Sequence, residues 1–166
     1  MDLRAVQKPL KEQYRKDPFT AVITLKARAT QMDVPVACSV DIGRAVYGAQ
    51  AHAGVGGSGT GACSGDLLLG SLTPCAQITC QMVAAGLQIP VQSVEVLVEG
   101  DLDLRGTLGV SKGAPVGFND IRVRFEIDAP EATARQLSRL REKTEECCVV
   151  TQTLNNPPNI RTQWTP

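Results

Sequence analysis

Apolar and polar side chains alternate along two stretches in the N-terminal part of the chain. The first stretch has its apolar positions at Ala21, Ile23, Leu25 and Ala27. The second has Val36, Cys38, Val40 and Ile42 on one side and, continued two by two, Arg44 and Val46. A period of two is typical of half-buried β-strands, so each stretch predicts a strand. The Asp-Val-Pro sequence at 33–35 predicts a turn between them.

Two longer stretches later in the chain also alternate. One has its apolar residues at every second position, at Val94, Val96, Val98, Leu102 and Leu104. This pattern predicts a strand with Gly100 as a candidate bulge. Ile121, Val123, Phe125 and Ile127 alternate with charged residues and predict the clearest strand of the chain.

Residues 66–86 form an apolar stretch of helical periodicity with hardly a charge after Asp66. A helix that is apolar all round is expected to be buried, at the centre of the domain or against a partner. Pro74 removes one helix donor, so we expect the helix to bend or restart there, with Thr73 as a cap and Pro74 as its first residue. Gly86 is the predicted end.

A second helix is predicted to begin at Asp128–Glu131, a capping-box pattern with proline in the first turn. Its apolar stripe contains Leu137, Leu140, Thr144, Cys147 and Cys148. The final segment, with two adjacent prolines, is expected to be extended. The order of elements indicates an α+β fold with antiparallel strands. Residues 1–19 are charged and predict an arm or a short helix that lies on the surface or on a partner. Residues 20–166 predict a single domain.

Composition narrows the possible functions. The chain has 166 residues, 43% of them hydrophobic, with 17 Lys and Arg against 17 Asp and Glu. A net charge of zero argues against a dedicated binder of nucleic acid or of an anionic membrane. No apolar run approaches the roughly 18 residues that span a bilayer. The polar N-terminus has no signal-peptide pattern, which predicts a cytoplasmic protein.

Neither a nucleotide nor a metal site is expected. The glycine-rich residues 53–61 lack the Lys-Ser/Thr ending of a P-loop, and backbone freedom for a crossing loop explains them better. No CxxC pair is present and His52 is the only histidine, which argues against zinc and against a serine-histidine-acid triad. We therefore predict no cofactor.

The six cysteines are the unusual feature, and in this context they are expected to be reduced. If a helix restarts at Pro74, Cys75 lies in a first turn, where free N–H groups favour a thiolate. The alternative is that Cys75 only fills a buried helix. Cys80 lies about 140° further around the helix and is expected in the core, as is Cys38. Cys63 is in the loop and undecided.

A thiol peroxidase needs a thiolate, a cation that keeps it ionised, often a carboxylate that orients the cation, and a second thiol. Either Cys147 or Cys148 could supply the second thiol if the two helices pack together. Arg44 is a candidate cation because strand parity turns it inward. Alternatively, its side chain extends to solvent from the end of the strand.

Two segments together resemble the OsmC family, whose branches include organic hydroperoxide resistance proteins. One is Asp66-Leu-Leu-Leu-Gly-Ser-Leu-Thr-Pro-Cys75, which follows the glycine-rich loop, and the other is Cys148-Val-Val-Thr-Gln-Thr-Leu154. The resemblance implies an intertwined homodimer, with antiparallel sheets wrapped around long central helices. It also implies a peroxidatic Cys75, a resolving Cys148 and a dithiol reductant such as a lipoyl protein.

The resemblance further implies that an arginine and a glutamate hold the thiolate. Gly65 stands where the peroxidase branches have that glutamate, and Asp66 follows one place later. The assignment of Arg44 as this arginine rests on strand parity alone. The predicted function is therefore thiol-dependent reduction of hydroperoxides. The alternatives are a non-enzymatic OsmC-like dimer, acting as a redox sensor or a ligand-binding protein, and a scaffold whose cysteines are only core residues.

Overall fold

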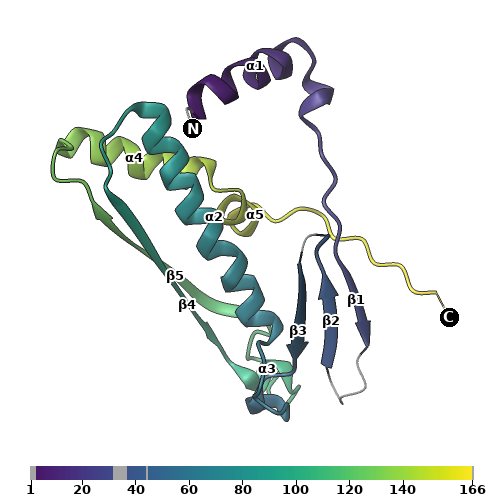
Figure 1. Cartoon of the computed structure of the whole chain (residues 1–166). Coiled ribbons are helices and arrows are strands. Elements are labelled where there is room, and N and C mark those ends of the chain that lie inside the picture. The colour runs from purple at the N-terminus through teal and green to yellow at the C-terminus, as the bar shows by residue number, and fades with distance from the viewer. Residues whose placement is uncertain (1–2, 32–36, 44, 166) are drawn as a thin grey trace. The chain divides into compact units, whose positions relative to one another are not determined.

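The computed structural model describes residues 3–31, 37–43 and 45–165 and has an α+β fold, as predicted (Figure 1). Its helices are α1 Leu3–Lys16, α2 Ser64–Leu87, α3 Leu104–Thr107, α4 Ala134–Cys147 and α5 Val149–Asn155, with short 3₁₀ helices at Pro18–Ala21 and Ala53–Val55. Its strands are β1 Arg28–Gln31, β2 Ala37–Asp41, β3 Val46–Gln50, β4 Ser93–Leu102 and β5 Phe118–Asp128.

The chain divides into two compact units. The first comprises Met1–Gly70 and Val98–Val123, and the second comprises Ser71–Leu97 and Arg124–Pro166. Helix α2 and strands β4 and β5 each contribute residues to both units.

An antiparallel sheet in the order β1-β2-β3 forms part of the first unit. The chain reverses between Asp41 and Val46, where Gly43 has a φ of 85° and its N–H donates to the Asp41 carboxylate. The prediction that one alternation continues to Val46 is therefore wrong, because the hairpin interrupts it. The predicted turn at 33–35 and the predicted inward position of Arg44 lie outside the described residues.

The predicted strand over residues 21–28 is also wrong, since β1 begins only at Arg28. Asp17 accepts a hydrogen bond from the N–H of Phe19, and Pro18 opens a 3₁₀ turn in place of a strand. The apolar residues that follow are exposed: Val22, Ile23 and Leu25. Their alternation is strand-like, but they belong to no strand. Before them, the predicted arm contains α1, which has no buried residue.

The glycine-rich loop confirms the expectation of backbone freedom. A Cβ on Gly57 would lie only 1.7 Å from the carbonyl oxygen of Ala51, and Gly56 and Gly59 have positive φ angles. The hydroxyls of Ser58 and Thr60 donate to the Gln50 side chain and hold the loop against the end of β3.

Helix α2 is continuous through Pro74, so the predicted restart at that residue is wrong. Its buried residues recur every four positions and form one stripe: Leu72, Ala76, Cys80 and Ala84. Within the described residues, α2 is the one helix long and apolar enough to cross a membrane, with a mean hydropathy of 1.3, and 22% of that segment is buried. A core helix meets the same criterion.

Strands β4 and β5 pair in a second, two-stranded sheet. Gln92, just before β4, donates its N–H to the carbonyl of Asp128 at the end of β5, consistent with an antiparallel pair. The two predicted strands are confirmed, except that Leu104 begins α3. Position 100 is a glycine because a Cβ there would lie only 2.6 Å from the Phe118 ring.

The predicted start of the second helix at Asp128–Glu131 is wrong. Helix α4 begins at Ala134, because Thr133 and Gln136 form a reciprocal capping box. Helix α5 was not predicted from the sequence. Residues 157–165 form no helix or strand and are extended, as expected (Figure 1). The core of the second unit combines the α2 stripe with Leu140, Thr144, Cys148, Val94 and Val96.

Candidate functional site

Two sulfur atoms from distant parts of the sequence meet in the second unit. The Sγ atoms of Cys75 on α2 and Cys148 at the end of α4 lie 3.6 Å apart. A disulfide bond is about 2.05 Å long, so a further approach of about 1.5 Å would join them. Both cysteines are reduced in this structure.

The packing of α4 against α2 brings the sulfurs together. The buried side of α4 contains Leu140 and Thr144, and Cys148 follows one turn later. The Thr144 hydroxyl lowers the pKa of Cys80, which lies on α2 five residues after Cys75, so these two side chains are neighbours. Later residues of α2 therefore face earlier residues of α4. This antiparallel register places Cys148 beside Cys75.

The local backbone decides which of the two adjacent cysteines meets Cys75. The N–H of Cys148 donates to the carbonyl of Thr144, and the residue then leaves the helix with φ −71° and ψ 106°. Its side chain is 1% exposed, while Cys147 is exposed to solvent. The sequence left both cysteines as candidates, and the structure places Cys148 in contact.

Neighbouring groups oppose the effect of burial on the ionisation of Cys148. Burial disfavours its thiolate, but the Thr151 hydroxyl, the N–H groups of Thr151 and Val150, and the Cys75 thiol together outweigh burial and lower the pKa of Cys148. The neutral thiol makes no capping hydrogen bond of normal geometry to α5, so these groups matter mainly for the ionised form. Because α5 was not predicted, sequence reasoning missed Thr151. A threonine three residues after the cysteine was the available signal.

The expected activation of Cys75 by a helix N-terminus is wrong, since α2 begins eleven residues earlier, at Ser64. Cys75 is half-buried in the middle of the helix. Its closest sulfur neighbour, Cys148, is therefore the group that the structure offers for its chemistry.

Asp66 caps the helix that contains Cys75. Its carboxylate accepts the backbone N–H of Cys63 at 2.8 Å, and Cys63 is the residue immediately before α2. This hydrogen bond, with smaller effects from the Cys63 thiol and His52, holds the pKa of Asp66 below its usual value despite the opposing effect of burial. The Asp66 carboxylate, which the sequence predicted to be catalytic, is therefore hydrogen-bonded to the backbone at the start of α2.

The remaining cysteines differ in burial. Cys80 is 1% exposed, as expected for a core residue, whereas Cys38 and Cys63 are half-buried. In the described part of the chain, no group of three or more His, Cys, Asp or Glu residues is arranged to hold a metal ion.

The sequence match covers both segments that contain the sulfur pair. A family model described as OsmC-like protein matches residues 57–163. The chain belongs to the OsmC-like family. No curated protein sequence matches it.

Solved structures of OsmC-like proteins have the same fold. An OsmC-like protein from Mycoplasma pneumoniae superposes with a TM-score of 0.67 at 14% identity, covering 81% of this chain and 89% of its own. An organic hydroperoxide resistance protein from Elizabethkingia anophelis has a TM-score of 0.61 at 18% identity, and the match covers 82% of this chain and 91% of that protein. Another organic hydroperoxide resistance protein, from Legionella pneumophila, has a TM-score of 0.61 at 17% identity, and the match covers 81% of this chain and 91% of that protein.

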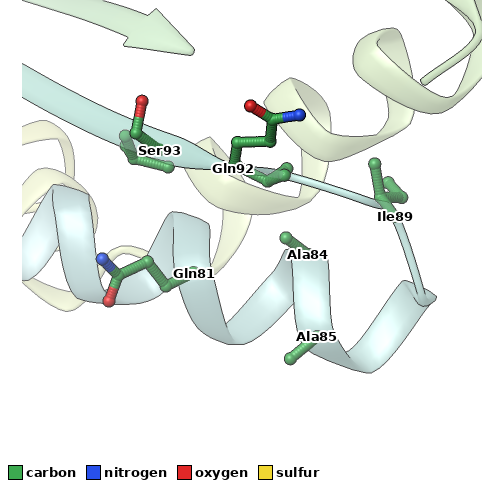
Figure 2. A pocket seen from close by; sticks show the side chains of 8 residues that line it. Gln81, Ala84, Ala85, Ile89, Gln92 and Ser93 are labelled. Atoms are coloured by element: carbon green, nitrogen blue, oxygen red, sulfur yellow. The ribbon is translucent and has the colours of Figure 1, made fainter. Parts of the chain in front are cut away.

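A separate hollow of about 330 Å³ lies between the end of α2 and the start of β4 (Figure 2). Its polar lining residues are Gln81, Gln92 and Ser93, and the others are aliphatic. Neither a thiol nor a charged side chain lines it, so it provides no group for redox chemistry in this OsmC-like chain.

Proposed function

We propose that this OsmC-like protein reduces organic hydroperoxides with Cys75 as the peroxidatic residue and Cys148 as the resolving residue. The observation that supports the proposal most directly is the 3.6 Å contact between their sulfurs. Membership of a family whose solved relatives include organic hydroperoxide resistance proteins adds to it.

The reaction has three steps. The Cys75 thiolate attacks the terminal oxygen of the hydroperoxide, the O–O bond breaks, and Cys75 becomes a sulfenic acid. The alkoxide that leaves takes a proton from solvent and becomes the alcohol. The Cys148 thiolate then attacks the Cys75 sulfur, so that a disulfide forms and hydroxide leaves as water after protonation. An external dithiol, for example a lipoyl group, reduces the disulfide and becomes a disulfide itself. The half-buried Cys75 is the more accessible of the two sulfurs, which suits it to meet the peroxide first.

The working molecule in this proposal is an intertwined homodimer with the long α2 helices at its centre. Helix α2 presents large apolar side chains to solvent in the single chain: Leu68 (37% exposed), Ile78 (54%) and Met82 (42%). Burial of such a surface against a second copy would supply a favourable hydrophobic contribution. Size-exclusion chromatography with light scattering tests this, since a monomer at micromolar concentration would contradict it.

The other parts of the proposal come from the sequence. Residues 20–166 act as one domain with residues 1–19 as an arm, and the protein works in the cytoplasm. Arg44 is kept as the cation that the sequence proposes. Asp66 contributes by capping the helix that contains Cys75.

Peroxide consumption by the purified protein, with a dithiol as reductant, tests the function. We expect Cys75→Ser to abolish turnover and Cys148→Ser to stop the cycle after one oxidation. The exposed Cys147 is the matched control, and Cys147→Ser should keep full activity. Peptide mapping after one equivalent of peroxide should find a Cys75–Cys148 disulfide. Full turnover in Cys75→Ser would refute the proposal.

A non-enzymatic redox sensor is the second candidate. Gly65 replaces the glutamate of the peroxidase branches, and the Asp66 carboxylate is hydrogen-bonded to Cys63. A sensor would form the same disulfide but consume no more than one peroxide per chain with a dithiol present. Multiple turnovers would therefore favour the enzyme.

A further inference from the structure

Helix α1 has an apolar stripe that the rest of the described chain does not bury. Its apolar side chains recur at spacings of three and four residues: Leu3, Val6, Leu10 and Tyr14. Val6 is 48% exposed, Leu10 42% and Tyr14 39%, and no residue of the helix is buried. A helix of 14 residues is marginal in water by itself, and Pro9 inside it removes one donor. The helix therefore gains stability from a second surface that covers the stripe.

The basic residues of α1 lie on both sides of this stripe. Four of them recur at spacings of three and four residues: Arg4, Lys8, Lys11 and Arg15. By helical geometry they lie about 125° around the helix from the apolar stripe, and Lys16 lies about as far from it on the other side. The one acidic residue of α1, Glu12, is on the opposite face.

The charge of α1 differs from that of the whole chain. Five basic residues against one acidic residue give this helix a net charge of +4, whereas the total for the chain is zero. The zero total argues against a chain that binds an anionic surface with its whole area, but it does not describe α1. A surface that covers α1 must therefore be apolar and must also provide negative charge.

We propose that α1 binds the surface of an anionic lipid bilayer and lies parallel to it, with its apolar stripe in the interface. A helix of this kind suits the interface because acyl chains accept the apolar side chains while lipid phosphates pair with the basic ones. The long side chains of Lys8, Lys11 and Arg15 can reach those phosphates from the flank of the helix. Tyr14 also suits the boundary, since its ring is apolar and its hydroxyl is polar.

The charges argue against a second copy of the chain as the surface that covers α1. If two α1 helices packed stripe against stripe, the basic side chains beside both stripes would meet and repel each other. The exposed apolar side chains of α2 offer no free opposite charge. Asp66 is the one acidic residue of α2, and its carboxylate already accepts the N–H of Cys63. A bilayer with anionic headgroups supplies the apolar and the charged component together.

This inference goes beyond the proposed function and does not depend on it. Helix α1 contains no cysteine and lies outside residues 57–163, which match the OsmC-like family model. Binding through α1 would hold the protein reversibly at a cytoplasmic leaflet, which presents anionic lipids. Vesicle binding and peroxide consumption can therefore be measured separately.

Co-flotation of the full-length protein with lipid vesicles tests the proposal. We expect binding to vesicles of phosphatidylcholine mixed with phosphatidylglycerol, much weaker binding to phosphatidylcholine alone, and release by added salt, which screens the charges. Lys8→Gln combined with Lys11→Gln should weaken binding about tenfold to thirtyfold, while Lys8→Arg combined with Lys11→Arg should retain it. Leu10→Gln should weaken binding about tenfold, because it places a polar side chain in the interface.

Two variants serve as matched controls. Glu12→Gln changes the face opposite the stripe and should not weaken binding. Leu154→Gln makes the same change as Leu10→Gln at a leucine of similar exposure on α5, 38% against 42%, and should bind like the wild type. Hydrogen exchange followed by mass spectrometry should show protection of residues 3–16 when the anionic vesicles are added.

Three results would overturn the inference. The first is equal binding of the wild type to neutral and anionic vesicles, or no binding to either. The second is wild-type binding by both Leu10→Gln and the variant with two glutamines in place of lysines. The third is a lower mass of Leu10→Gln in light scattering without any vesicle binding, which would assign the stripe to a second copy. A protein that binds vesicles through α1 but consumes no peroxide would refute the proposed function and leave this inference intact.

Discussion

The Thr144 hydroxyl interacts with the Cys80 thiol inside the packing of α4 against α2. Thr144 is 2% exposed, and in the described part of the chain its oxygen has no hydrogen-bond partner of normal geometry. A thiol is a poor partner for a hydroxyl, so this contact compensates little for the water that Thr144 loses on folding. The same layer of side chains contains the sulfur pair, one turn further along α4.

Replacement of this hydroxyl by a methyl group should stabilise the protein. We expect Thr144→Val to raise the free energy of unfolding by about 1 kcal/mol, because the penalty of an unpaired buried hydroxyl disappears at nearly constant volume. For a chain of this size that corresponds to about 2–4 °C in Tm by calorimetry. Thr153→Val is the control, since its exposed hydroxyl already has a partner, and it should not raise Tm. A lower Tm for Thr144→Val would show that the Cys80 contact is worth more than its geometry indicates.

Cys80 should be the least reactive of the cysteines on the two packed helices. Burial raises the pKa of its thiol more than the Thr144 contact lowers it, and the side chain is 1% exposed. In native protein at pH 8 we expect iodoacetamide to modify the exposed Cys147 within minutes and to modify Cys80 only after urea unfolds the chain. Peptide mass spectrometry over time measures this order. Labelling of Cys80 as fast as Cys147 would contradict the packing described here.

Gly100→Ala should destabilise the pairing of β4 with β5. A Cβ at this position would lie 2.6 and 2.7 Å from two atoms of the Phe118 ring, so the ring must move. We expect a loss of about 1–3 kcal/mol in urea denaturation, the range for overpacked sites. Gly117→Ala is a suitable control, because a Cβ there meets nothing within 4 Å. The smaller side chain in a Gly100→Ala, Phe118→Leu double variant should recover part of the loss.

Asp66→Asn should make α2 less well capped and reduce the sensitivity of stability to acid. The pKa of Asp66 is lowered in the folded state, so its contribution is complete above the unfolded pKa of about 3.9 and is lost as the pH falls through the folded value. Because the side chain is exposed, we expect a loss of under about 1 kcal/mol at pH 7. The difference between wild type and variant should disappear by about pH 2 in chemical denaturation. A difference that persists at that pH would assign the effect to something other than the charge.

The strength of local patterns explains which elements could be predicted from the sequence. The strands around Val94–Val98 and Ile121–Ile127 have clean alternation and were found, whereas the 21–28 pattern is as regular but forms no strand over residues 21–27. Alternation indicates that the side chains suit a strand, but it does not indicate whether a second strand is available to pair with it. Likewise, Pro74 inside α2 suggested an interruption, but the packing of its buried stripe keeps the helix continuous.

The residues of the sulfur site were predictable, but their arrangement was not. The sequence by itself determined that the chain has six cysteines, a long apolar helix with Cys75 in it and an amphipathic helix ending in Cys147 and Cys148. Tertiary structure decided that Cys148 and not Cys147 meets Cys75. Helical periodicity gives each side chain a direction around its own axis. Only the packing of α4 on α2 gives the two helices a common register, and a one-residue change of that register would bring a different side chain to Cys75.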